Sequence, residues 1–171
     1  MGDWEAGIEI CRRAIETSPD AVAVSNALGF LGYAYVEKGD ADAAIPLLEQ
    51  SSQQMSGFQF SRGRIRFLIE IGNAHLLRGE MERARERAAE GLEAAERAGY
   101  AIAVGLAHLA LGRIALGRGA HTDAAARLAE ALRIFGAIPV RFDLGKTHLA
   151  LAELAHAQGD RMSAAGHLAQ A

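Results

Sequence analysis

The chain is short of the residues that mark several classes of protein. It has a single cysteine, Cys11, among 171 residues, which excludes an internal disulfide framework and is compatible with a reducing, cytoplasmic setting. Lysine occurs only as Lys38 and Lys146, and the formal net charge is −3. The basic surface expected of a nucleic-acid-binding protein is therefore missing, and we expect no direct nucleic-acid partner.

Long apolar runs are also absent. The most apolar stretch, residues 101–116, is interrupted by His108 and Arg113, whereas a membrane span needs about 18 consecutive apolar residues. The first residues contain no basic region followed by an apolar run, so we expect neither membrane insertion nor a secretory signal. The 50% hydrophobic and 23% charged residues indicate a folded chain, and the excess of arginine over lysine indicates a bacterial source.

Motifs for chemistry are not found either. The six histidines form no His-Glu-x-x-His pair or Cys/His cluster, the glycines of residues 112–119 lack the Gly-Lys-Ser/Thr ending of a phosphate loop, and no Gly-x-Ser-x-Gly elbow occurs. Cys11 lies on an apolar helix stripe, which favours a buried, inert thiol. His108 and His148 occupy equivalent positions and are expected to pack beside a partner helix. We therefore predict no catalytic residue, metal site or cofactor, and no enzyme.

A short turn sequence recurs at a fixed interval. A glycine followed by a polar or small residue stands every 40 residues, at Gly39, Gly79, Gly119 and Gly159. Such regularity is the signature of a repeat array. An earlier copy, Gly2-Asp3, lies 37 residues before Gly39, so the opening unit is slightly shorter.

The segments between these turns have apolar residues three or four apart, which predicts helices and no strands. We expect Ser18 and Thr122 to be N-caps, and Pro46 to kink the helix that contains it. The expected helices are residues 2–18, 19–38, 60–78, 81–98, 101–118, 122–135, 141–158 and 161 to the end, together with one that starts at Asp40 or Asp42 and ends at Ser56-Gly57.

Aligned on the turn glycines, the units resemble the tetratricopeptide repeat. Its Leu-Gly pair appears as Leu31-Gly32, Ile71-Gly72 and Leu111-Gly112, with Leu151-Ala152 as a departure that keeps the second residue small. Its small residue five positions after the turn glycine is Ala44, Ala84, Ala124 and Ala164, and its closing proline is Pro19. The period of 40 exceeds the ~34 residues usual for the family. The resemblance implies an all-α fold, an α-α superhelix (solenoid) of antiparallel helix pairs.

We expect one array over residues 1–171. Its units are a half unit at 2–19 and full or partial units at 20–57, 58–99, 100–139 and 140–171. A helical stack needs polar caps at both ends, and neither end shows one. The chain is therefore predicted to be a fragment of a longer array, or to associate with itself through its ends.

The resemblance also implies that the first helices of successive units line a concave groove. The residue six positions before each turn glycine then points into the groove: Tyr33, Asn73, Arg113 and Glu153. The residue thirteen positions before it gives a second row: Asn26, Arg66, Leu106 and Lys146. Long polar side chains of mixed charge suit an extended peptide, although ordinary exposed helix surface has the same pattern. The basic residues Arg62, Arg64 and Arg66 form either a docking patch for an acidic segment or a solvated helix start.

Two functions follow from this reading. The first is a non-enzymatic protein–protein interaction module that binds a peptide or protein segment in the groove. The alternative is a ligand- or peptide-sensing regulatory region of a bacterial multidomain signalling protein or transcription regulator, because long units rich in alanine and arginine resemble those of such proteins.

Overall fold

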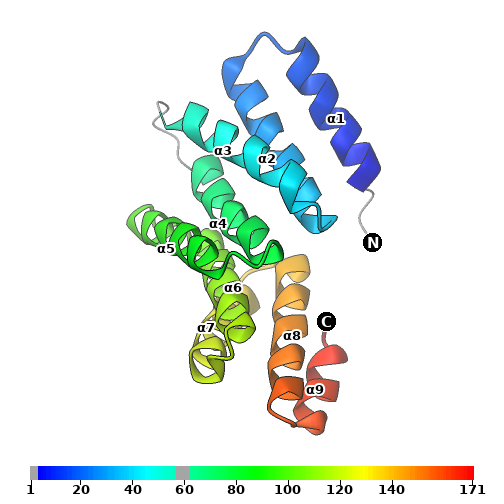
Figure 1. Cartoon of the computed structure of the whole chain (residues 1–171), viewed down its shortest axis with the longest axis vertical. Coiled ribbons are helices and arrows are strands. Elements are labelled where there is room, and N and C mark those ends of the chain that lie inside the picture. The colour runs from blue at the N-terminus through cyan, green and yellow to red at the C-terminus, as the bar shows by residue number, and fades with distance from the viewer. Residues whose placement is uncertain (1–3, 57–61) are drawn as a thin grey trace. The chain divides into compact units, whose positions relative to one another are not determined.

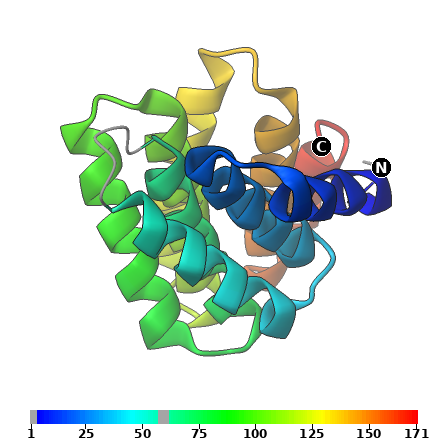
Figure 2. The same cartoon turned by 90° about the horizontal axis from the view of Figure 1, so that it is seen from above.

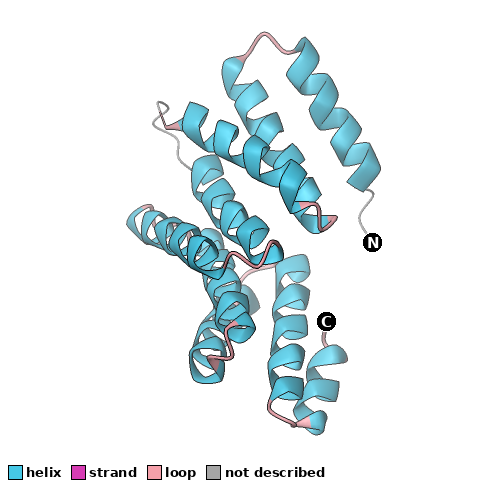
Figure 3. Ribbon diagram, viewed as in Figure 1, coloured by secondary structure: helices cyan, strands magenta, loops and turns pink. Residues whose placement is uncertain are grey.

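The computed structural model describes residues 4–56 and 62–171, and every regular element among them is a helix (Figure 3). The chain divides into two compact units, unit 1 (Met1–Gly91) and unit 2 (Leu92–Ala171). The predicted all-α class of antiparallel helix pairs is confirmed. No described helix is long and apolar enough to cross a membrane. The helices are α1 (Trp4–Thr17), α2 (Ala21–Glu37), α3 (Ala41–Met55), α4 (Arg62–Leu77), α5 (Met81–Arg97), α6 (Ala101–Gly117), α7 (His121–Gly136), α8 (Arg141–Ala157) and α9 (Arg161–Leu168).

The recurrent turn glycines end the first helix of each pair. Gly39, Gly79, Gly119 and Gly159 have φ of 80°, 74°, 72° and 80°, a left-handed conformation that glycine adopts without steric cost. After α2, the Gly39 N–H donates to Val36 O at 2.9 Å and the Asp40 N–H to Tyr35 O at 2.9 Å. These two bonds form the Schellman motif, which satisfies carbonyls at the helix end. The glycine period is therefore a period of helix stops.

Small residues let the paired helices approach closely. A Cβ built on Gly32 would lie 2.6 Å from Leu48 Cγ, and one on Gly72 would lie 3.0 Å from the Ala84 carbonyl oxygen. On the facing helices, Ala44, Ala84 and Ala124 are fully buried. Helix pairs at this separation cannot admit a larger side chain at these positions.

Unit 1 is built from successive helices in contact. The structure pairs α1 with α2, α2 with α3, and α3 with α4, and α2 also contacts α4 (Figures 1 and 2). One buried cluster, with Ile8 and Leu31, joins α1 to α2, and Cys11 is partly buried against it. Burial raises the pKa of the Cys11 thiol, so the expected unreactive, protonated form is favoured.

Unit 2 repeats this arrangement. Here α6 pairs with α7, α7 with α8, and α8 with α9, while α6 also contacts α8 (Figure 1). Leu128, Ala131 and Phe135 of α7 are fully buried. They are spaced by three and four residues, so one stripe of α7 packs into the core.

Several expected helix boundaries are wrong. Asp20, not Ser18, is the N-cap of α2, because its carboxylate accepts from the N–H groups of Val22 and Ala23; Ser18 Oγ accepts from Asp20 N instead. The cap of α7 is Ala120 and not Thr122. The tight glycine turn explains this shift, because it leaves only one residue between the turn glycine and the next helix.

Two further points concern helix length. The helix α3 runs from Ala41 to Met55 with Pro46 inside it, and the kink expected at Pro46 stays a prediction. The last helix, α9, ends at Leu168 and does not reach the end of the chain. The expected start of the fourth helix at residue 60 lies outside the described residues.

Candidate interaction surfaces

The structure brings two predicted groove residues of unit 1 together. Tyr33 lies on α2 and Arg66 on α4, and the Arg66 Cζ lies 4.8 Å from the centroid of the Tyr33 ring. This is the geometry of a cation–π interaction. One residue from each of the two predicted rows, Tyr33 and Arg66, is therefore in contact with the other.

A third residue extends the contact onto α1. The rings of Trp4 and Tyr33 meet edge to face, with centroids 5.8 Å apart and planes at 84°. Trp4, Tyr33 and Arg66 are each partly exposed. We call these three residues the aromatic column. Sequence reasoning did not include Trp4, because both predicted rows are counted back from a turn glycine and Trp4 has no place in that count. The one signal in the sequence was that Trp4 is the only tryptophan.

The other two predicted residues of unit 1 lie on the same helices. Asn26 Nδ2 donates to Val22 O at 3.0 Å within α2, and Asn73 Nδ2 donates to Glu70 Oε2 at 2.9 Å within α4. Within residues 4–56 and 62–171, two buried polar atoms of this face find no hydrogen-bond partner, Arg66 Nε and Asn73 Oδ1. An unpaired buried polar atom of this kind costs about 1–3 kcal/mol.

In unit 2 the predicted residues of α8, Lys146 and Glu153, lie on a partly exposed stripe. Lys146 Nζ lies 5.3 Å from the centroid of the Phe142 ring, and Glu153 is exposed. Phe142 and Leu149, with exposed fractions of 53% and 46%, alternate with them at spacings of three and four residues. We call these four residues the α8 stripe. On α6, Arg113 is partly exposed whereas Leu106 is buried in the core.

The α8 stripe shows what sequence reasoning missed. The spacing of Phe142 and Leu149 is two turns of helix, the same as that of Lys146 and Glu153, so the sequence contained this signal. Apolar residues at helical spacing are normally buried, so this spacing alone does not predict an exposed contact surface. The short α9, of eight residues, leaves part of α8 without that cover.

The basic residues at the start of α4 do not form a free patch. Arg64 Nη2 lies 3.4 Å from Glu90 Oε1, and Arg66 lies on the Tyr33 ring. Two of the three arginines thus have partners within the chain, which favours the reading of an ordinary helix start over a docking patch.

The two equivalent histidines lie against the helices that pair with theirs. His148 Nδ1 of α8 and His167 Nδ1 of α9 are 3.2 Å apart. Burial, and secondarily the neighbouring His167, lowers the pKa of His148. Burial, and secondarily Arg127, also lowers the pKa of His108 below its ordinary value of 6.5. Both histidines therefore favour the neutral form in the folded unit 2.

We expect the stability of unit 2 to fall as the pH falls below about 6.5. Because the folded pKa of both histidines is lowered, the unfolded state binds protons in this range that the folded state does not, and the stability is fully present only above it. Urea unfolding at pH 7.5 and pH 5.5 measures the change. The double variant His108→Gln/His148→Gln should lose most of this pH dependence, and His156→Gln, at an exposed position of α8, should keep it. Equal pH dependence in all three proteins would contradict the assignment.

The fold defines the chain as an α-helical repeat protein. Residues 25–53 match the model of the tetratricopeptide repeat family. This segment is thus similar to the tetratricopeptide repeat, the family that the turn glycines and the Leu-Gly pairs resemble. No curated protein sequence matches it.

Solved structures share this fold at low sequence identity. A Rap protein complexed with Competence and Sporulation Factor superposes with a TM-score of 0.82 and 15% identity, covering 91% of this chain and 44% of that chain. BtubC from P. vanneervenii gives 0.71 and 19%, covering 99% and 72%. A Podosopora anserina putative kinesin light chain with TPR-like repeats gives 0.63 and 18%, covering 99% and 85%. The chain thus spans less than half the length of the Rap protein.

Proposed function

We propose that this chain is a non-enzymatic, cytoplasmic protein–protein interaction module that binds an extended peptide segment across the α2–α4 face of unit 1. The aromatic column is the observation that carries the proposal. Tryptophan, tyrosine and arginine are the residues most enriched among those that dominate binding energy at protein interfaces. Here Trp4, Tyr33 and Arg66 come from three different helices. The Trp4 ring meets the Tyr33 ring edge to face, and the Arg66 guanidinium lies over the Tyr33 ring.

The polar groups of the same face suit a peptide backbone. Arg66 Nε is a donor and Asn73 Oδ1 an acceptor, and each is unpaired among the described residues. Seven helical residues separate them, about 10 Å along α4. An extended peptide rises about 3.4 Å per residue, so two of its residues three positions apart match this distance. Once the two side chains turn outward, a peptide carbonyl would accept from Arg66 and a peptide N–H would donate to Asn73.

Unit 2 carries a candidate contact surface of its own. In the α8 stripe, Phe142 and Leu149 supply apolar area, while Lys146 and Glu153 supply one charge of each sign. Arg113 of α6 is the remaining predicted contact. Exposed charged groups of this kind contribute less than about 1 kcal/mol each, so the aromatic column should dominate the affinity.

The proposal is tested by peptide selection followed by substitution. Peptides are selected from a random library on the immobilised chain, and their affinities are then measured for the wild type and for Tyr33→Ala/Arg66→Ala. Loss of two dominant contacts, about 2 kcal/mol or more, corresponds to an affinity at least ~30-fold weaker. Arg13→Ala, an exposed arginine of α1, is the matched control and should bind normally. Unchanged affinity in the folded double variant would show that the peptide binds elsewhere.

A second candidate function is the sensing of a peptide or small ligand within a larger bacterial regulator. The likeness in fold to a Rap protein that was crystallised with Competence and Sporulation Factor favours it. The two functions share the binding face but differ in what is attached. An ATPase, cyclase or DNA-binding domain encoded beside residues 1–171 would support the sensor, and further repeats alone would support the simple interaction module.

A further inference from the structure

The α2–α4 face of unit 1 carries a large apolar side chain that the aromatic column does not include. Phe30 of α2 is 47% exposed, and it lies three residues before Tyr33 on the same side of the helix. Its ring meets the ring of Phe67 of α4 edge to face, with centroids 5.6 Å apart and planes at 89°. Phe30 therefore bridges α2 to α4 about one helical turn away from the contact between Tyr33 and Arg66.

The other repeats show that the fold does not require an exposed phenylalanine at this position. The residues at the same place in the following repeats, at intervals of 40, are Glu70, Ala110 and Ala150. Each of these three residues is buried, whereas nearly half of the Phe30 side chain is open. Phe30 adds its open side to the partly exposed rings of Trp4 and Tyr33. An exposed apolar patch of this kind, in contrast to a single exposed side chain, marks a contact site.

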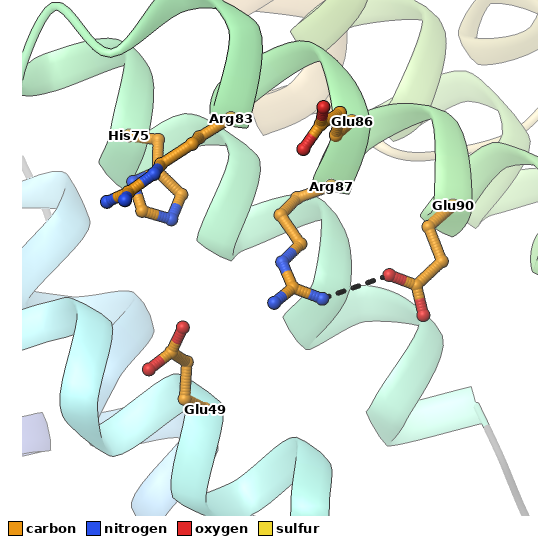
Figure 4. A pocket seen from close by; sticks show the side chains of 6 residues that line it. All are labelled: Glu49, His75, Arg83, Glu86, Arg87 and Glu90. Atoms are coloured by element: carbon orange, nitrogen blue, oxygen red, sulfur yellow. Dashed lines mark hydrogen bonds and ion pairs between the residues drawn. The ribbon is translucent and has the colours of Figure 1, made fainter.

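The two sides of α4 differ in character. Leu77, 45% exposed, lies three helical turns after Arg66 and so on the same side of α4. His75 lies two and a half turns after Arg66, on the opposite side, where a hollow of about 550 Å³ is lined by titratable side chains of α3, α4 and α5 (Figure 4). In this lining Arg87 Nη1 donates to Glu90 at 3.1 Å (Figure 4). An apolar partner group therefore finds its match on the Phe30 side of α4.

We propose that Phe30 is the specificity-determining residue of the peptide face, and that the bound segment places a large apolar side chain, aromatic above all, on its open side. This inference rests on the function proposed above. Aromatic side chains bury a large apolar area, lose few rotatable bonds and pair edge to face, as Phe30 and Phe67 already do. The partner is therefore a protein segment with an exposed aromatic residue.

The spacing along α2 allows one short peptide to make both kinds of contact. Phe30 precedes Tyr33 by about 4.5 Å along the helix axis, and an extended peptide rises about 3.4 Å per residue. An aromatic side chain on Phe30 and the peptide backbone beside Arg66 then belong to neighbouring or next-but-one residues of the partner. The peptide backbone supplies contacts that any sequence can make, whereas the Phe30 contact selects the sequence.

A double-mutant cycle on a selected peptide tests the inference. Peptides selected on the wild-type chain should share one position that holds phenylalanine, tyrosine or tryptophan. Calorimetry then gives the affinities of the wild-type and Phe30→Ala proteins for one such peptide and for its variant with alanine at that position. Phe30→Ala should weaken binding of the aromatic peptide by about tenfold or more, and binding of the alanine variant by less than about twofold, because the partner of the ring is already absent.

Two further variants control this measurement. Phe30→Ala should stay folded, because Ala110 and Ala150 stand at the same place in other repeats, and circular dichroism verifies this. Phe30→Leu keeps apolar area and should weaken binding by about threefold, so it tests the contact even if the alanine variant unfolds. Ile10→Ala should bind normally. Ile10 is 68% exposed and lies two residues after the buried Ile8 of α1, so it points away from α2.

The inference and the proposed function fail through different results. If Tyr33→Ala/Arg66→Ala weakens binding but the folded Phe30 variants bind as tightly as the wild type, the peptide face stands and the role of Phe30 is wrong. Selected peptides without a shared aromatic position would also overturn that role. An equal loss for both peptides of the cycle would show that Phe30 acts through the fold and not by contact. Unchanged affinity in Tyr33→Ala/Arg66→Ala would overturn the peptide face itself.

Discussion

Replacement of Gly29 by alanine is expected to lower the free energy of unfolding of unit 1 by about 2 kcal/mol. A Cβ at this position would lie 2.1 Å from Cε2 and 2.2 Å from Cζ of Phe67. The Phe67 ring cannot simply move away, because it is fully buried and the ring of Phe30 meets it edge to face at 5.6 Å. Overpacking of this kind outweighs the better helix propensity of alanine. Urea unfolding of the variant measures the loss.

The same substitution elsewhere in unit 1 provides the control. Gly7 lies in α1, and a Cβ built on it meets no atom within 4 Å. Gly7→Ala should therefore stabilise unit 1 by about 0.5–1 kcal/mol, the ordinary gain of alanine over glycine in a helix. A stabilised Gly29→Ala protein would show that α2 and α4 are not packed as closely as described.

Truncation of Phe135 is expected to cause the largest loss of stability in unit 2. Its side chain is fully buried, and a Cβ built on Gly105 would lie 2.5 Å from the Phe135 ring, so α6 and α7 meet at this residue. Phe135→Ala should lower the free energy of unfolding by about 3–5 kcal/mol, because it removes apolar burial and leaves a cavity. Thermal unfolding followed by circular dichroism measures the effect.

Phe142→Ala is the matched control for this truncation. Phe142 belongs to the same unit but is 53% exposed, and its loss should change the stability by less than about 0.5 kcal/mol. An equal loss of stability in the two variants would contradict the burial of Phe135 in the core of unit 2.

The class of fold was predictable because the constraints that define it are local. A helix that ends in a left-handed turn requires glycine at one position of the sequence. Here that requirement recurs at Gly39, Gly79, Gly119 and Gly159. The close approach of paired helices likewise requires small residues at particular positions, such as Gly32 and Ala44. The exact helix starts were less predictable. Asp20 and Ser18 are both good caps by type, and only the backbone geometry decides which side chain reaches the free N–H groups.

Part of the candidate surface was predictable for the same reason. Counting back from the turn glycines assigned Tyr33 and Arg66 to the predicted groove rows of successive first helices, and in the structure these two side chains touch. Trp4 was not predictable, because its approach to Tyr33 depends on how α1 packs on α2. The ion pair between Arg64 of α4 and Glu90 of α5 was not predictable either, because it depends on which carboxylate the arginine reaches.

The central claim is that a peptide partner binds at the aromatic column, and the fluorescence of Trp4 tests it most directly. Trp4 is the only tryptophan of the chain, and its ring lies against Tyr33, so its emission reports on this position alone. Titration with a selected peptide that lacks tryptophan should change the intensity or wavelength of the emission, with the midpoint that calorimetry gives for binding. Saturated binding with no change in Trp4 emission would contradict the account.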